Sequence, residues 1–226
     1  MIGSVGQPLL FLLALGFGFG PVYARAGGGN YLQFLAPGVI AMSILFTAMF
    51  GGIEIIWDRQ FGFLKETMVA PVSRFEIMLG RAFGGATVAV AQGIFVFLIS
   101  MLVGFRPHGA LVPLALLFMM LIALLFTALG TAIGSMLEDM QAFPLIMNFL
   151  VMPIFFLSGA LFPLAGAPRG IAIIATLNPL SYGVHGLRAT LLEGVSSGLG
   201  IDFVVLVGVS ALFLGIGSYV FSKAQV

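Results

Sequence analysis

The chain contains the apolar stretch Leu111-Val-Pro-Leu-Ala-Leu-Leu-Phe-Met-Met-Leu-Ile-Ala-Leu-Leu125, which lies inside a run without charged side chains, residues 107–137. A helix needs about 20 apolar residues to cross the ~30 Å hydrocarbon core of a bilayer, so this run is long enough. A strand of a membrane barrel would instead alternate apolar and polar residues over about ten positions. The run therefore predicts a membrane-spanning helix.

The composition of the whole chain agrees with a membrane protein. Of 226 residues, 61% are hydrophobic and 8% are charged, against roughly 25% charged in an ordinary soluble domain. Nine basic and eight acidic side chains cannot form the charged shell that a soluble domain of this length needs. This excludes a soluble enzyme, a nucleic-acid-binding protein and a disordered chain. With no cysteine and two histidines, the sequence predicts neither disulfides nor a Cys- or His-based metal site.

Charge-free runs elsewhere in the chain predict six spans in total. The other runs are residues 1–24, 26–53, 82–105, 140–168, 170–187 and 203–222. All but 170–187 are long and apolar enough to cross a bilayer, which places the spans at about residues 5–23, 32–57, 82–104, 110–136, 142–162 and 202–222. The run 170–187 is shorter and contains Asn178 and Ser181, whose polar groups would be unpaired in lipid. We therefore predict one all-α integral membrane domain over residues 1–226, with six transmembrane helices and a re-entrant helical segment, residues 168–194, before the last span.

Basic residues indicate which side of the membrane each loop occupies. Four of the nine, Arg59, Lys65, Arg74 and Arg81, lie in the loop 58–81, and loops rich in basic residues usually stay cytoplasmic. Six spans then place both termini on the cytoplasmic side of the plasma membrane. The basic residues divide five against four between the two sides, and a seven-span arrangement gives the same division, so their number leaves both arrangements open.

The N-terminal segment has some features of a signal peptide. Residues 9–20 resemble its apolar core, but Met1–Pro8 carries no charge, and a signal peptide begins with a basic region. We therefore expect this segment to be retained as the first span.

The loop 58–81 holds seven charged residues and has a helical pattern of its own. Apolar residues recur at helical spacing and the charges lie off that stripe, which predicts a short amphipathic helix parallel to the membrane. The apolar residues are Phe61, Leu64 and Met68, and the charged ones are Lys65 and Glu66. Pro71 ends this helix, because proline disfavours helix at the preceding residue. Ser73 and Glu76 have the spacing of a capping box that opens the next helix.

Two interpretations of this loop fit its residues. It can be a solvated connector whose apolar stripe rests on lipid, or a docking surface that passes motion from a cytoplasmic partner into the membrane. Glu138 and Asp139, between two predicted spans, likewise form either a solvated turn or a second, smaller contact.

Two blocks of sequence resemble a known family. Asp58–Glu66 and Val69–Arg74 resemble the first cytoplasmic loop of ABC-2 type exporter permeases, most closely the daunorubicin/doxorubicin-resistance branch. The second block is similar to the fifth span of that family and the re-entrant hairpin before its sixth. It consists of Asn148–Gly159, Phe162-Pro163, Asn178–Tyr182 and Gly186–Arg188.

The resemblance implies a fold, partners and a set of site residues. The family has six spans and both termini in the cytoplasm, and two permease copies, here a homodimer, pair with two copies of a separate ABC ATPase that binds ATP and Mg²⁺. The first loop provides a coupling helix that seats in a groove of the ATPase. The residues carried over to this role are Phe61, Gly62, Leu64, Lys65, Glu66, Pro71 and Arg74. The implied function is multidrug-type export of a hydrophobic or amphiphilic substrate, such as a drug-like molecule, a lipid or a lipid-linked glycan. Family members usually begin with a cytoplasmic arm, and Met1 stands about where that arm would end.

Four further residues are candidates for a gate or conduit. Glu54 lies one turn inside Trp57, at membrane depth, where an ionisable group is by default a functional hypothesis. Its structural alternatives are snorkelling to the interface or pairing with Arg59. Asn178 and Pro179 suit the start of a short helix, Pro179–Leu192. On this helix Tyr182, His185 and Arg188 form either a structural plug or a substrate exit gate.

The sequence lacks the motifs of an enzyme and has no cofactor site that we recognise. There is no G-x-x-x-x-G-K-[ST] segment, so we predict no ATPase activity of its own. A secondary transporter is an alternative, although the predicted spans contain few of the ionisable residues that it would use. An intramembrane serine protease would need a Ser158–His185 dyad. The glycine pairs Gly80–Gly84 and Gly130–Gly134 match G-x-x-x-G, which permits close approach of membrane helices.

Overall fold

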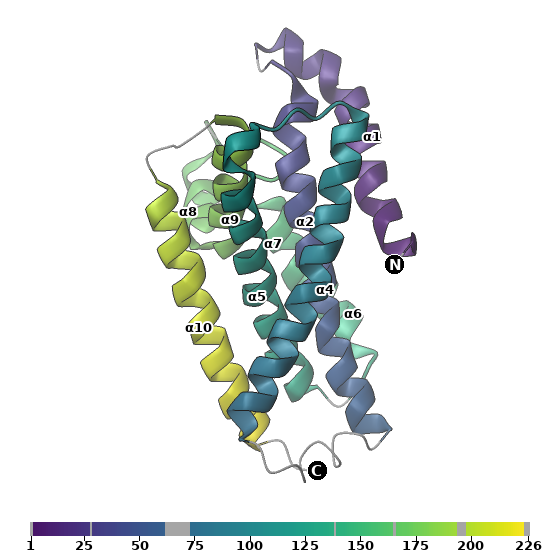
Figure 1. Cartoon of the computed structure of the whole chain (residues 1–226), viewed down its shortest axis with the longest axis vertical. Helices are drawn as coiled ribbons and strands as arrows, with labels where there is room; N and C mark the ends of the chain where they lie inside the picture. Colours follow the sequence, from purple (N-terminus) through teal and green to yellow (C-terminus); the bar gives the residue numbers. More distant parts are fainter. Residues whose placement is uncertain are drawn as a thin grey trace.

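The computed structural model describes residues 2–27, 29–61, 73–137, 139–164, 166–193 and 198–223. Within these ranges all regular structure is helical. Five long helices form an elongated bundle (Figure 1), and several short helices pack along it and at one end. The long helices are α1 (Ile2–Arg25), α2 (Tyr31–Gln60), α4 (Arg74–Val103), α5 (Val112–Met136) and α10 (Leu199–Lys223). The short helices are a 3-10 turn (Gly109–Leu111), α6 (Ala142–Ile146), α7 (Met152–Phe156), α8 (Arg169–Leu177) and α9 (Pro179–Arg188), with π-helical segments at Met147–Val151 and Ala189–Glu193.

Five helices of the described residues are long and apolar enough to cross a membrane. They are Gly6–Arg25, Tyr31–Gln60, Phe75–Val103, Gly109–Met136 and Leu199–Val220, and each overlaps a predicted span. The span predicted at 142–162 is instead a shorter helix, Ala142–Phe156. It widens into a π turn just before Pro153, which has no N–H to donate to the preceding turn, and regular helix stops before Leu157. The all-helical class is thus confirmed, and the count of six spans stays a prediction.

Helix α5 occupies the centre of the bundle and packs against α2, α4 and α10. Its large side chains Phe118 and Phe126 are fully buried. The seam between α2 and α5 is very tight, because a Cβ atom added at Gly134 would lie 2.2 Å from the carbonyl oxygen of Gly52. Close approach through the predicted Gly130–Gly134 pair is therefore confirmed, whereas a Cβ at Gly80 or Gly84 would meet nothing within 4 Å.

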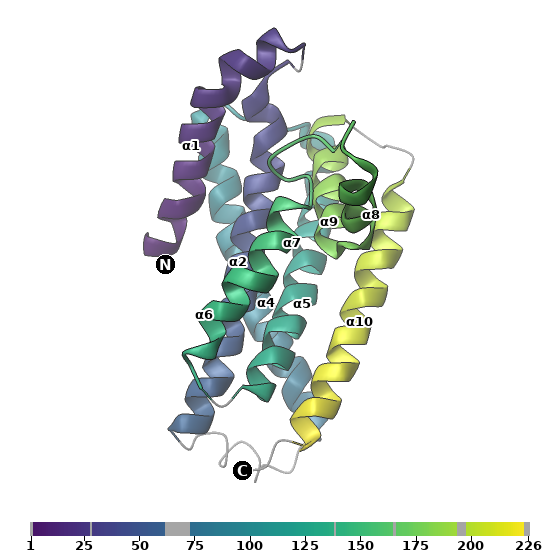
Figure 2. The same cartoon turned by 180° about the vertical axis from the view of Figure 1, so that it is seen from behind.

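The two ends of the bundle differ in what they contain. At one end, here called the loop end, α2, α5 and α10 finish and α4 begins, so both helices that flank the predicted coupling loop share this end with the C-terminal part of α10 (Figure 1). At the other end, here called the hairpin end, α9 packs against α10 and α8 lies against α9 (Figure 2). The predicted grouping of the loop 58–81 with the C-terminal end of the last helix agrees with this arrangement.

The segment before the last long helix forms the hairpin of α8 and α9, which stays at its own end of the bundle (Figure 2). Asn178 caps α9: its side-chain oxygen accepts a hydrogen bond from the N–H of Leu180, 3.0 Å long. Its amide nitrogen donates to the carbonyl of Ile154, 2.6 Å away, which anchors the hairpin to α7. Pro179 takes the first helical position. The predicted cap and the helix beyond it are confirmed.

Candidate functional site

An ion pair joins the two helices that flank the predicted coupling loop. The guanidinium of Arg81 on α4 donates to the carboxylate of Asp58 near the end of α2, 2.5 Å away. Both side chains are largely shielded, at 20% and 29% exposure, which strengthens a charged contact relative to one in open water. The ion pair therefore holds together the two helix ends from which the loop emerges, at residues 23 positions apart in sequence.

The neighbouring Arg59 connects α2 to α5. Its guanidinium donates to the carbonyl oxygens of Ser135, at 2.8 Å, and Leu137, at 3.1 Å. These carbonyls lie at the C-terminal end of α5, where helix carbonyls lack intrahelical partners and positive charge is favoured. Asp58, Arg59 and Arg81, together called the loop clamp, thus attach α2 to both α4 and α5. The sequence analysis placed all three residues in or beside the loop but did not predict these contacts.

The predicted capping box at the start of α4 is confirmed. The Ser73 hydroxyl accepts from the N–H of Glu76 at 3.2 Å, and the Glu76 carboxylate accepts from the N–H of Ser73 at 2.8 Å. The chain thus enters α4 in a fixed direction directly after the loop.

Most of the predicted coupling residues lie outside the described residues. These are Gly62, Leu64, Lys65, Glu66 and Pro71, and Glu138 also falls outside. Phe61 is described and is 72% exposed at the end of α2. Arg74 is the first residue of α4.

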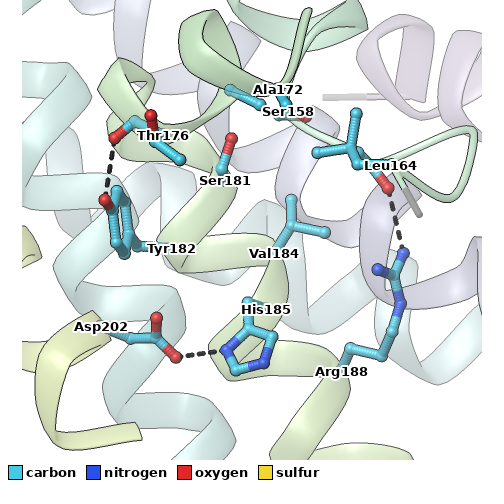
Figure 3. A pocket seen from close by; sticks show the side chains of 12 residues that line it. Ser158, Leu164, Ala172, Thr176, Ser181, Tyr182, Val184, His185, Arg188 and Asp202 are labelled. Atoms are coloured by element: carbon cyan, nitrogen blue, oxygen red, sulfur yellow. Dashed lines mark hydrogen bonds and ion pairs between the residues drawn. The ribbon is translucent and has the colours of Figure 1, made fainter. Parts of the chain in front are cut away.

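The hairpin end contains a pocket of about 420 Å³, called the hairpin pocket (Figure 3). Three of the four predicted gate residues line it: Tyr182, His185 and Arg188. Its volume falls within the range of small-molecule sites. These three side chains therefore lie at one pocket, and their role as a structural plug or an exit gate stays a prediction.

Three polar side chains of the hairpin pocket have specific contacts, whereas the buried hydroxyl of Ser181 has no hydrogen-bond partner among the described residues. Nδ1 of His185 lies 2.6 Å from a carboxylate oxygen of Asp202, which joins α9 to the first turn of α10 (Figure 3). The Tyr182 hydroxyl donates to the carbonyl of Thr176 at 2.8 Å, within the hairpin. Asp202 was not identified from sequence, although it is the last charge before the run 203–222.

Arg188 attaches the hairpin to the rest of the bundle. It donates to the carbonyl oxygens of Gly159, at 3.2 Å, and Phe34, at 3.3 Å. Its guanidinium carbon also lies 3.9 Å from the centroid of the Phe34 ring, a cation–π contact with α2.

The serine protease alternative finds no support in the pocket geometry. Ser158 and His185 both line the hairpin pocket, but the Ser158 hydroxyl donates to the Phe155 carbonyl at 2.7 Å and accepts from the N–H of Ala160 at 3.2 Å. The ring nitrogen of His185 pairs with Asp202. A nucleophile needs a hydrogen bond to its base, and these contacts do not supply it.

Glu54 lies apart from the hairpin pocket, near the loop end. The alternative that it pairs with Arg59 is wrong, because the guanidinium of Arg59 turns to the carbonyls at the end of α5. Glu54 instead lines a separate small cavity with Arg81 and Thr127. No group of three or more His, Asp or Glu side chains that could hold a metal ion occurs among the described residues.

Comparison with known proteins identifies the family. The model of the family described as "ABC-2 type transporter" matches residues 1–192. The chain is 31% identical over 193 residues to the transport permease ycf38 of Cyanophora paradoxa, an alignment that covers 83% of this chain and 66% of the relative. It is 30% identical over 194 residues to nodulation protein J of Rhizobium leguminosarum bv. trifolii, covering 85% and 74% respectively. The chain thus spans about 66% of the length of its ycf38 relatives. With its helical bundle and its helices long enough to cross a membrane, this chain belongs to the ABC-2 type transporter family.

Proposed function

We propose that the chain is the membrane-spanning subunit of an ATP-driven exporter in the plasma membrane, powered by a separate ABC ATPase. Two copies of the chain, as a homodimer, pair with two ATPase subunits, which bind ATP and Mg²⁺. Family membership supports this proposal, and so does the lack of a phosphate-binding G-x-x-x-x-G-K-[ST] motif in the chain.

The loop end faces the cytoplasm in this proposal. The basic residues clustered around the loop support this orientation. The helix Ala142–Phe156, with the residues that follow it, then provides the fifth of six crossings. Both termini lie on the cytoplasmic side, and the hairpin of α8 and α9 lies toward the outer surface.

The loop clamp is the observation that carries the coupling mechanism. In the proposed cycle the ATPase pushes on the loop, with Phe61, Gly62, Leu64, Lys65, Glu66, Pro71 and Arg74 at the contact. A push on the loop reaches α4 through the Asp58–Arg81 pair and α5 through the contacts of Arg59. Because α5 packs against α2, α4 and α10, motion of its end reaches most of the bundle.

The hairpin pocket is the proposed exit gate. Its walls combine apolar residues such as Leu164, Ala172 and Val184 with the polar side chains of Tyr182, His185 and Arg188. Such a surface suits a hydrophobic or amphiphilic substrate, which can be a drug-like molecule, a lipid or a lipid-linked glycan. The His185–Asp202 contact between α9 and α10 would have to separate for the gate to open. A role in multidrug resistance remains a prediction from the resemblance alone.

Reconstitution with the ATPase tests the function. The purified chain should hydrolyse no ATP, and with its ATPase it should drive ATP-dependent efflux that stops when the Walker lysine of the ATPase is replaced. Efflux that continues without ATP hydrolysis would instead support a secondary transporter.

Loop substitutions test the coupling site in the same assay. Glu66→Lys and Leu64→Asp should leave expression intact and strongly reduce ATPase association or efflux, because both positions precede the predicted proline stop in the proposed contact. Glu138→Lys, in the short connection after α5, is the control and should have a smaller effect. Normal efflux by both loop variants would show that the loop is a connector and not the site of contact with the ATPase.

Thiol labelling tests the orientation, and the chain has no native cysteine to interfere. Cysteine at Gln60, exposed at the loop end, should resist a membrane-impermeant reagent in intact cells. Cysteine at Arg169, exposed at the hairpin end, should react. The reverse pattern would invert the topology.

A further inference from the structure

A small cavity lies between α2, α4 and α5, next to the loop clamp. Its volume is about 130 Å³, and its lining includes Glu54, Arg81, Thr127 and Thr131. Glycines at positions 51, 84 and 85 also line it, and a glycine leaves space where a larger side chain would fill the gap. At about 30 Å³ for each water molecule, the cavity has room for a group of a few heavy atoms.

Glu54 supplies a carboxylate to this cavity without a partner of its own. It is exposed, and it forms no hydrogen bond or ion pair with the residues that the structure describes. The nearest cation that lines the cavity, Arg81, is engaged by Asp58. One negative charge at the cavity is therefore left without a bonded cation within the described part of the chain.

Thr127 supplies a second acceptor, and its burial is informative. Thr127 is 0% exposed, and its Oγ1 atom forms no hydrogen bond with any described residue. Buried polar atoms are nearly always hydrogen-bonded, so an unpaired hydroxyl on a cavity wall points to a missing partner. Thr131 adds a third oxygen, whose hydroxyl already donates to the carbonyls of Thr127 and Ala128, at 2.8 and 3.0 Å, and can therefore act as an acceptor.

The depth of the cavity is that of a lipid headgroup. Glu54 lies one turn before Trp57, which is 49% exposed, and tryptophan is typical of the membrane–water interface. Glu54, an exposed carboxylate of the cavity lining, is thus placed where the polar heads of lipids and water are both within reach.

We propose that this cavity binds a primary ammonium group, independently of the transported substrate. An ammonium carries a positive charge and three N–H donors, which match the carboxylate of Glu54 and the hydroxyls of Thr127 and Thr131. A quaternary trimethylammonium group has the same charge but no N–H, so it cannot donate hydrogen bonds to the hydroxyls. Two sources supply the same chemistry: the ethanolamine headgroup of a membrane lipid and a soluble amine.

The test compares lipids that differ only in their amine. The purified full-length chain is placed in vesicles of phosphatidylcholine alone or with phosphatidylethanolamine, and the apparent melting temperature is measured. We expect stabilisation of a few degrees by phosphatidylethanolamine and none by its trimethylated counterpart. A separate arm adds ethylammonium or tetramethylammonium chloride to phosphatidylcholine vesicles; stabilisation by ethylammonium alone identifies a soluble amine as the source.

Three variants show whether the effect belongs to this cavity. Glu54→Gln and Thr127→Val should abolish the amine-dependent shift. The Thr127 variant is nearly isosteric and removes a hydroxyl without a partner, so the ligand-free protein should still fold. Thr87→Val is the matched control, because Thr87 is an exposed α4 threonine whose hydroxyl donates to the Phe83 carbonyl; it should keep the full shift. Equal melting temperatures with and without primary amines, or a shift that survives in both cavity variants, would overturn the proposal.

Discussion

The loop end and the hairpin end of the bundle use polar contacts in different ways. At the loop end, Asp58, Arg59 and Arg81 connect long helices to one another, beside a glycine seam where two backbones nearly touch. At the hairpin end, the contacts of His185 and Arg188 connect one short helix to the long ones. The first arrangement ties three long helices together, whereas the second adds polar contacts to a short helix that is also packed into the bundle, with Leu180 and Leu187 fully buried. In the proposed function, the loop end transmits motion and the hairpin end acts as the gate.

The largest expected effect comes from breaking the tight seam near the loop end. Replacing Gly134 with valine would place a Cβ 2.2 Å from the Gly52 carbonyl oxygen, which a fixed backbone cannot accommodate. We expect a loss of folding stability of about 3 kcal/mol or more. The variant should therefore show a reduced yield in the membrane and a lower melting temperature. Gly84→Ala is the control, since its Cβ meets nothing within 4 Å. A Gly134 variant as stable as this control would show that the seam tolerates separation.

The loop clamp should give the next largest effect. Asp58→Arg replaces an ion pair with two like charges, which removes about 2 kcal/mol of charged hydrogen bonding and should strongly reduce coupled efflux. The double variant with Arg81→Asp restores opposite charges and should recover much of the loss. The measurement is a double-mutant cycle on efflux and on ATPase association. If the double variant does not recover, the pair has a role other than holding together the two helices that flank the loop.

The smallest effect on stability is expected at the hairpin end. His185→Gln removes a contact whose histidine is 49% exposed, so the cost in folding stability should be at most about 1 kcal/mol. If the contact closes the exit gate, efflux or uncoupled leak of substrate should change while the melting temperature barely moves. Arg169→Gln, an exposed substitution on α8, is the control. A variant that changes melting temperature but not transport would make the contact structural.

Local rules of sequence recovered the features that depend on neighbouring residues. The capping box of Ser73 and Glu76 and the cap of α9 by Asn178 form between residues two or three positions apart, so their spacing is sufficient to predict them. The limits of the helix Ala142–Phe156 were harder to predict. Apolar composition continues past Phe156, and only the backbone shows where regular helix ends.

Partners across the fold could not be read in the same way. Glu54 and Arg59 are five positions apart, and the sequence suggested an ion pair between them. Arg59 instead donates to the carbonyls of Ser135 and Leu137, which are 76 and 78 positions away. The glycine pairs on α4 and α5 have the same spacing, and only the pair on α5 faces another backbone in this chain. Both outcomes depend on how helices rotate about their axes when they pack, which a single helical pattern does not specify.

The sequence by itself determined that this protein is a helical membrane protein of the ABC-2 type, because lipid demands long charge-free runs and the two motif blocks lie in short, contiguous segments. Tertiary structure alone decided that Asp58 meets Arg81, that His185 meets Asp202, and that Thr127 borders a cavity without a hydrogen-bond partner among the described residues. Each of these depends on side chains from different helices arriving at one point. That convergence is set by the packing of whole helices around α5, to which residues from across the chain contribute together.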